Sequence, residues 1–233
     1  MGIRLIAMTE QRQPGQPADH HIGFFKLLEF MEQPGCPVCR MAQAEIIREM
    51  EHFLYESVND PELRRRMRAD GGLCPTHGGL LAEKSDALAG SILVGDWLAA
   101  ARDRLKESGK AGTGAAGRGA ASCHFCRIDR AAQRRIILQL ADNLADDQLQ
   151  ARWSGPVMLC VTHLQTLGHL TRHRAIFQQV FAVHVEKKYQ HILDQMALTI
   201  ARHDYQRTGE PLGEERNAWR TALATLCGTT VQA

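Results

Sequence analysis

Eight cysteine and histidine residues, arranged as two copies of one pattern, constrain this chain more than any other feature. In the first copy Cys36-x-x-Cys39 is followed after 34 residues by Cys74-x-x-His77, and in the second Cys123-x-x-Cys126 is followed after 33 residues by Cys160-x-x-His163. Three cysteines and one histidine can complete the tetrahedral shell that Zn²⁺ prefers in proteins. The sequence therefore predicts two metal sites, site 1 with Cys36, Cys39, Cys74 and His77, and site 2 with Cys123, Cys126, Cys160 and His163.

The predicted ligand sets are closed, because four protein ligands leave no coordination position for water or substrate. Such sites suit a structural role rather than hydrolysis, and we expect two Zn²⁺ ions as cofactors. An iron–sulfur cluster with mixed ligands is an alternative. Redox-active dithiols are another, although neither Cys-x-x-Cys pair has the strand–turn–helix context of a thioredoxin-like motif.

The two halves of the chain match beyond the ligands. Leu73 precedes Cys74 as Leu159 precedes Cys160, and Leu81 corresponds to Leu167. Asn59-Asp60 falls where Asp146-Asp147 falls when both are counted from the preceding cysteine pair. This register predicts an internal duplication and a pseudo-twofold arrangement of two modules.

The residues between the ligand pairs have helical rather than strand periodicity. Ile46, Ile47, Met50, Phe53 and Leu54 recur at spacings of three and four, and no alternating strand pattern is visible. The longest helical signal runs from about residue 165 to 205. It predicts either a core helix of the same bundle or an arm that projects to a partner. The fold class is therefore all-α, with two helical zinc modules and a long C-terminal helix.

Low-complexity segments give the domain organisation. Residues 1–21 lack apolar periodicity and are expected to form a flexible arm, and the Gly/Ala-rich residues 108–121 are expected to form a linker. Module 1 then spans residues 22–107, and module 2, with the long helix and the C-terminal tail, spans residues 122–228.

Several of these segments resemble one known family. They are residues 28–40, Phe53–Leu63, the Leu73–His77 element, the second cysteine pair with Leu159, Cys160 and His163, and a tail from Asp204 to Gly228. Together they resemble an uncharacterised prokaryotic domain-of-unknown-function family with duplicated Cys-x-x-Cys…Cys-x-x-His modules. The resemblance covers roughly residues 22–228 and implies a helical zinc-binding protein. It implies no activity.

Composition is ordinary for a globular protein, with 44% hydrophobic and 23% charged residues in a chain of 233. No run approaches the roughly 20 apolar residues that cross a bilayer, and the first ten residues do not resemble a secretory signal. We therefore expect a cytoplasmic protein without a membrane span. The formal charge of +2 becomes about zero with six thiolates and two Zn²⁺ ions, which gives no field for nucleic acid.

The densest basic cluster, Arg64, Arg65, Arg66 and Arg68, could contact an anion or nucleic acid, but acidic neighbours make a solvated helix face the favoured interpretation. No nucleophile elbow, Walker A loop or dinucleotide fingerprint is present, which favours a non-catalytic protein. The first hypothesis is a scaffold or adaptor that binds a protein partner, with homo-oligomerisation through the long helix as a variant. The alternatives are a redox- or metal-responsive regulator and a nucleic-acid-associated factor.

Overall fold

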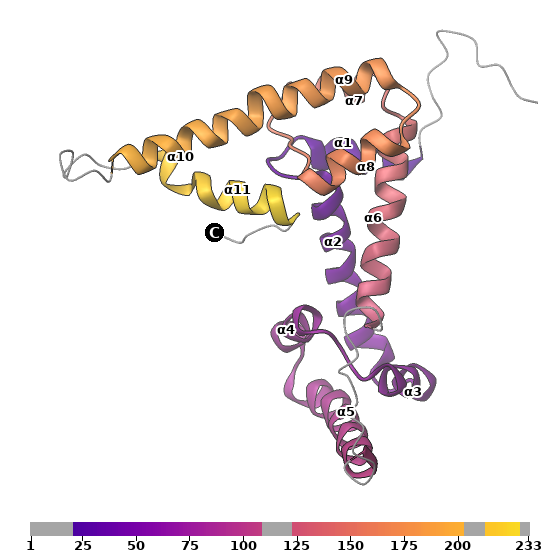
Figure 1. Ribbon diagram of the computed structural model, residues 1–233. Coiled ribbons are helices and arrows are strands. Elements are labelled where there is room, and N and C mark those ends of the chain that lie inside the picture. The colour runs from indigo at the N-terminus through magenta and orange to yellow at the C-terminus, as the bar shows by residue number, and fades with distance from the viewer. Residues whose placement is uncertain (1–20, 109–122, 203–212, 229–233) are drawn as a thin grey trace, which may run out of the picture.

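The computed structural model describes residues 21–108, 123–202 and 213–228, and every regular secondary-structure element in these ranges is a helix (Figure 1). The elements are α1 (Ile22–Met31), α2 (Pro37–His52), the π-helix η1 (Phe53–Ser57), α3 (Pro61–Asp70), α4 (Pro75–Lys84), α5 (Ala87–Ser108), α6 (His124–Asp142), α7 (Asp147–Arg152), α8 (Val161–Leu170), α9 (Arg174–Ala182), the π-helix η2 (Val183–Tyr189), α10 (Gln190–Arg202), the 3₁₀ turn η4 (Glu214–Asn217) and α11 (Ala218–Cys227). The all-α prediction is confirmed. The expected N-terminal arm and Gly/Ala linker fall almost entirely outside the described residues.

An antiparallel pair of helices, α2 and α6, forms the central axis of the molecule (Figure 1). One contact shows that the two helices run antiparallel: Phe53, just after α2, contacts Phe125 at the start of α6, with ring centroids 5.8 Å apart. Buried side chains recur every four residues on both helices, so each helix offers one apolar stripe to its neighbour. These residues are Ala42, Ile46 and Met50 on α2 and Ala132, Ile136 and Leu140 on α6.

Each end of the α2–α6 pair carries its own hydrophobic core. Around the start of α2 and the end of α6 pack α1, α7, α8 and α9. Around the end of α2 and the start of α6 pack η1, α3, α4 and α5. Each core therefore combines segments from both halves of the sequence, and Figure 1 shows the two groups of helices at opposite ends of the α2–α6 pair.

The two halves repeat one local arrangement, in which a Cys-x-x-Cys helix leads to a short capped helix and then to a Cys-x-x-His helix. Asp60 caps α3 and Asp146 caps α7, each accepting two backbone N–H bonds, and each lies 14 residues before Cys74 or Cys160. The segment from Cys39 to Asp60 is one residue longer than the segment from Cys126 to Asp146. The wider turn of the π-helix η1 accommodates this additional residue. The internal duplication itself stays a prediction.

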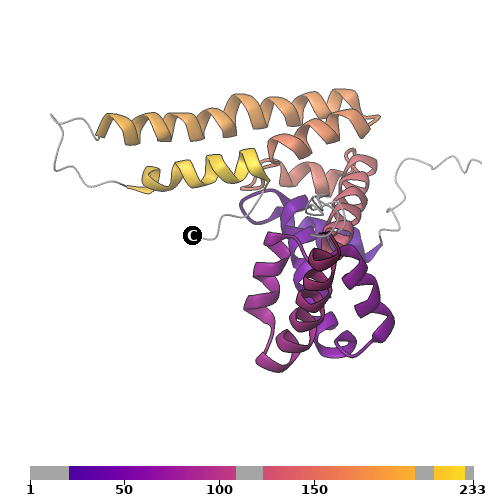
Figure 2. The same cartoon turned by 60° about the horizontal axis from the view of Figure 1, so that its bottom comes forward.

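The long helix begins at Arg174, so the prediction that it starts near residue 165 is wrong. Thr171 leaves α8 in an extended conformation, and its Oγ1 accepts the His173 N–H at 3.1 Å, which ends one helix before the next begins. The helix then continues from α9 through η2 to α10 (Figures 1 and 2). Phe177 and Val180 of α9 are buried in the core, whereas α10 has no buried residue and lies beside α11. The helix is thus a core helix at its start and a projecting one at its end.

Candidate metal centres

The structure brings the eight predicted ligands into two Cys₃His groups, but it pairs them across the halves. Site A consists of Cys36, Cys39, Cys160 and His163, and site B of Cys74, His77, Cys123 and Cys126. The predicted sites 1 and 2 each took both ligand pairs from one half, and this pairing is wrong. All eight residues belong to the two groups, and the error lies only in which pair meets which.

Helix length explains the exchanged pairing. From Pro37 to Ser57 the chain is continuously helical, which carries it about 30 Å away from Cys36 and Cys39 at about 1.5 Å per residue. The short α3 does not return the chain along this path, so Cys74 and His77 emerge near the far end of α2. The antiparallel α6 places Cys123 and Cys126 at that same end. The same argument, applied to α6, takes Cys160 and His163 to the start of α2.

In site A the four donor atoms lie at distances that suit one small ion. The Cys39 and Cys160 Sγ atoms are 3.8 Å apart. His163 Nδ1 lies 3.1 Å from Cys160 Sγ, 3.3 Å from Cys39 Sγ and 3.5 Å from Cys36 Sγ. Covalent S–S bonds of about 2.05 Å are thus absent from the group.

Site B has the same geometry. The Cys74 and Cys126 Sγ atoms are 3.5 Å apart. His77 Nδ1 lies 3.2 Å from Cys74 Sγ, 3.4 Å from Cys126 Sγ and 3.6 Å from Cys123 Sγ.

These distances can be compared with the edges of a zinc tetrahedron. Bonds of about 2.3 Å to sulfur and about 2.0–2.1 Å to nitrogen place two sulfurs about 3.8 Å apart and a sulfur and a nitrogen about 3.6 Å apart. The donor atoms of both sites approach these separations. The two groups therefore fit a tetrahedral ion such as Zn²⁺, and both can hold one.

Helix N-termini favour thiolates in both sites. Cys36, Cys74, Cys123 and Cys160 each occupy the N-cap position of a helix, so each site receives two helix N-termini. The free N–H groups and the positive end of the helix dipole stabilise an adjacent negative charge. The chain thereby offsets part of the repulsion among the sulfur atoms.

In site A the thiols and the imidazole change one another's protonation. A hydrogen bond with Cys36, and then one with Cys39, lowers the pKa of Cys160, whereas the bond with Cys160 raises the pKa of Cys39. Burial lowers the pKa of His163, but hydrogen bonds with the Cys160 and Cys36 sulfurs outweigh it and raise the pKa to about 10.

Site B shows a similar division. Burial and the bond with Cys74 raise the pKa of Cys126 to about 12. Burial opposes ionisation of Cys74, but hydrogen bonds from the His77 backbone and from the other two thiols lower its pKa. A metal ion entering either site must displace the shared protons, so acid weakens its binding.

The surroundings of the two sites differ. In site A the peptide of Leu159, directly before Cys160, is held on both sides, because His184 Nε2 accepts its N–H at 3.0 Å and Tyr189 Oη donates to its carbonyl at 2.7 Å. At site B burial lowers the pKa of His77, and the Asp129 charge only partly opposes this. No side-chain hydrogen bond reaches the corresponding Leu73 among the described residues. Cys74 and Cys126 are both half-buried.

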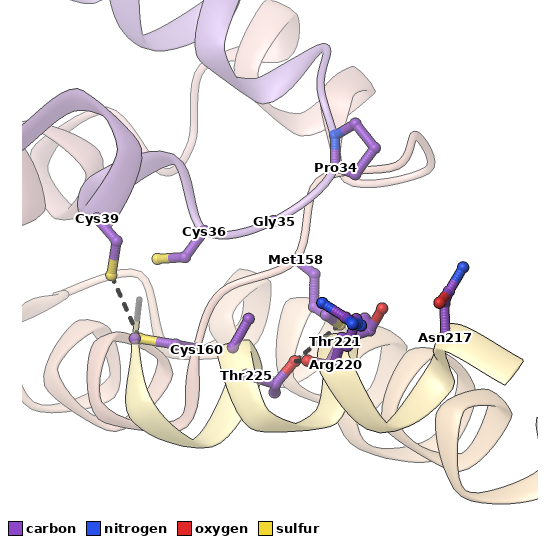
Figure 3. Close-up of a pocket in the computed structure, with 12 residues that line it drawn as sticks. Pro34, Gly35, Cys36, Cys39, Met158, Cys160, Asn217, Arg220, Thr221 and Thr225 are labelled. Atoms are coloured by element: carbon purple, nitrogen blue, oxygen red, sulfur yellow. Dashed lines mark hydrogen bonds between the residues drawn. The ribbon is translucent and has the colours of Figure 1, made fainter. Parts of the chain in front are cut away.

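The C-terminal helix also reaches site A. Gly228, which ends α11 with a φ of +71°, lies so close to the sulfurs that a Cβ there would be 3.3 Å from Cys39 Sγ and 3.4 Å from Cys160 Sγ. Figure 3 shows α11 running past Cys39 and Cys160, with Thr225 beside Met158. A pocket of about 250 Å³ remains between α11 and the site. Sequence analysis assigned no role to Gly228 or Tyr189, because only tertiary contacts connect them to the surroundings of Cys160.

The predicted arginine cluster lies on α3 and is largely paired with acidic side chains. Arg64 and Arg68 contact Asp96 at 2.7 and 3.6 Å. Arg65 and Arg66 contact Glu62 at 2.7 and 3.9 Å. These pairs reduce the field that a phosphate would meet.

Comparison with known proteins identifies a family for the chain. A family of unknown function, DUF6062, matches residues 25–233. The chain belongs to this family. An uncharacterised 23.9 kDa protein in the xynA 3' region of Caldicellulosiruptor sp. (strain Rt8B.4) is 25% identical over 210 residues, which cover 87% of this chain and 100% of the relative. No solved structure matches the DUF6062 chain, and no helix in the described part of it is long and apolar enough to cross a membrane.

Proposed function

We propose that this protein is a non-catalytic zinc-binding scaffold, in which two Zn²⁺ ions fasten the two halves of the chain and hold a pair of projecting helices for a protein partner. One observation carries the proposal: each Cys₃His group takes two ligands from each half, at distances close to the edges of a zinc tetrahedron. Bound zinc supplies four bonds at each site and no open position for a substrate. A cytoplasmic location, where thiols stay reduced, agrees with this role.

The partner surface that we propose is the outer face of the long helix and α11. Leu193 and Ile200 on α10 are 56% and 72% exposed, and Trp219 and Leu226 on α11 are 50% and 65% exposed. Arg220 is the single charged residue of α11, which is unusual for a helix in contact with water. These features support a contact with an apolar face of another protein. A second copy of this chain is an alternative occupant.

Metal analysis tests the metal part of the proposal. Protein purified without oxygen should contain two zinc ions per chain by inductively coupled plasma mass spectrometry. Cys39→Ser and Cys126→Ser should each lose one ion and lower the melting temperature, because each removes a ligand of a different site. Cys227→Ser is the matched control, since Cys227 is exposed and belongs to neither group. A Cys39→Ser protein that kept both ions and its melting temperature would refute the ligand assignment.

The partner surface has a separate test. Wild-type protein and a Leu226→Glu variant should carry the same metal and the same helical content, but the variant should lose binding to any partner that the wild type captures reversibly at defined concentrations. Light scattering over a concentration series distinguishes the occupants, because self-association would appear as a dimer that Leu226→Glu abolishes.

A redox- or metal-responsive regulator is the second candidate. It is favoured by the partial exposure of Cys39, Cys74 and Cys126, which leaves thiolates open to oxidants. Release of zinc by micromolar peroxide, or bound iron with visible absorption, would support this role over the scaffold. A nucleic-acid-associated factor has less support, because the arginines of α3 are paired; it requires salt-sensitive binding that Arg64→Ala with Arg65→Ala weakens.

A further inference from the structure

The residues behind Cys160 differ from those behind Cys74, although the two cysteines hold equivalent places in the sequence. Leu159 donates its N–H to His184 Nε2 and accepts from Tyr189 Oη. His184 Nδ1 lies 2.8 Å from the Val180 carbonyl and donates its hydrogen to it. Because Nε2 accepts the Leu159 N–H, it carries no hydrogen, and the ring is neutral. The fully buried imidazole thus fixes the peptide that delivers Cys160 to site A.

The same π-helix, η2, holds the whole segment that leads to Cys160. Lys188 Nζ donates to the carbonyls of Trp153 and Gly155 at 3.0 and 2.9 Å and also to that of Val157. A π-helix has more residues per turn than an α-helix, so residues 184, 188 and 189 can face the same side. The Met158 N–H is bonded to the Gly35 carbonyl at 3.1 Å, which ties this segment to the residue before Cys36.

The C-terminal helix adds a second restraint to site A. Gly228 covers one side of the Cys39 and Cys160 sulfurs, so these atoms cannot move toward α11. Cys160 and Cys36 are 1% and 8% exposed, and Cys39 is half-buried.

At site B the restraints among the described residues lie further from the cysteine. The segment before Cys74 is held by backbone bonds from Gly71 and Gly72 to the end of α3. The Trp97 ring lies beside Gly72, where an added Cβ would be 3.6 Å from it. Among the described residues no side-chain hydrogen bond reaches Leu73 itself, whereas earlier in the segment Arg104 donates to the Arg68 carbonyl at 3.1 Å and Arg127 pairs with Asp70 at 2.8 Å. In site B Cys123 is 3% exposed, whereas both Cys74 and Cys126 are half-buried, so site B has one more half-buried cysteine than site A.

From this difference we infer that His184 and Tyr189 are positioning residues for site A, and that site A holds its metal ion more tightly, whereas site B is the site that exchanges its ion. The inference rests on the proposed function, since it needs an ion in both sites. Partners that fix a metal ligand from outside the coordination shell commonly contribute 10–100-fold to metal affinity. Site B is then the site through which the chain can respond to metal supply or oxidation.

The test uses the full-length protein with two zinc ions and a chelating dye, 4-(2-pyridylazo)resorcinol, under argon. Zinc should leave in two steps. After one equivalent has been released, alkylation with N-ethylmaleimide and peptide mapping should find label on Cys74, Cys123 and Cys126 and little on Cys36, Cys39 or Cys160. Release of both ions in one step, or first label on the site A cysteines, would overturn the inference. Fewer than two zinc ions at the start would count against the proposed function instead.

Variants of the positioning residues provide the second arm. Tyr189→Phe and His184→Leu should weaken zinc binding at site A about 10–100-fold and leave site B unchanged. His184→Gln should restore most of the affinity, because its amide can accept from Leu159 and donate to Val180. Tyr55→Phe, at an 89% exposed tyrosine, is the matched control and should change neither site. If His184→Leu does not fold, the isosteric Tyr189→Phe decides, and equal weakening of both sites would disprove the assignment.

Discussion

At the residue scale, His184 has a second consequence, for the dependence of stability on pH. Burial is the main reason that its pKa falls from 6.5 to about 4, and the nearby Lys188 charge acts in the same direction. Protonation would place a hydrogen on Nε2, which now accepts the Leu159 N–H. The folded state therefore binds this proton less readily than the unfolded state.

We predict that the His184 contribution is complete above about pH 6.5 and is lost as the pH falls toward 4. The loss is about 3 kcal/mol, because the unfolded chain takes up the proton throughout this interval. Urea unfolding of wild type and His184→Gln, compared at equal measured zinc content at each pH, gives the difference. The wild type should lose more stability over this range than the variant, and parallel curves would show that His184 does not titrate as expected.

Gly168 has a steric role that a substitution can measure. A methyl group at this position in α8 would lie 2.6 Å from Phe177 Cζ, and the Phe177 ring is buried in the core. Gly168→Ala should therefore lower the free energy of unfolding by about 1–3 kcal/mol through overpacking. In α5 a Cβ added at Gly95 would meet no atom of another part of the chain within 4 Å. Gly95→Ala should therefore raise the free energy of unfolding by up to about 1 kcal/mol through helix propensity. Chemical denaturation compares the two, and equal effects would contradict this account.

At the scale of elements, the caps of α3 and α7 are the local features most readable in the sequence. Asp60 Oδ1 accepts the Glu62 and Leu63 N–H groups at 2.9 and 3.2 Å. Asp60→Ala should cost about 1 kcal/mol, and Asp60→Asn, which keeps an acceptor, should cost much less. Thermal unfolding of both variants makes the comparison. If the alanine variant is as stable as the asparagine variant, the side-chain cap of Asp60 does not stabilise α3.

Helices were predictable where a local sequence pattern determined their ends, and less predictable where tertiary packing determined them. The apolar stripe of α2 predicted a helix in the right place. The break at Thr171 was not predicted, because apolar residues continue with helical spacing on both sides of it. Here a side-chain bond within the turn and the packing of Phe177 against Gly168 decide where the helix ends.

At the scale of the whole molecule, the exchanged ligand pairs make the two halves depend on each other. If the chain is divided within residues 109–122, neither half contains a complete site A or site B. Each half alone should bind zinc weakly, and a mixture of the two should bind two ions and gain helical structure. Isothermal titration with zinc and circular dichroism measure both effects. One tightly bound zinc in either isolated half would instead support pairing within each half.

The sequence by itself predicted the eight candidate ligand residues and determined the helical class, because cysteine spacing and apolar periodicity act over a few residues. It could not determine which Cys-x-x-Cys meets which Cys-x-x-His, since both pairings use the same residue types. The tertiary structure decided this through the length of α2 and α6 and their antiparallel packing, which place the start of each helix at the end of the other. It also decided that η2 and Gly228 lie at site A, and so made two sites with the same ligands unequal.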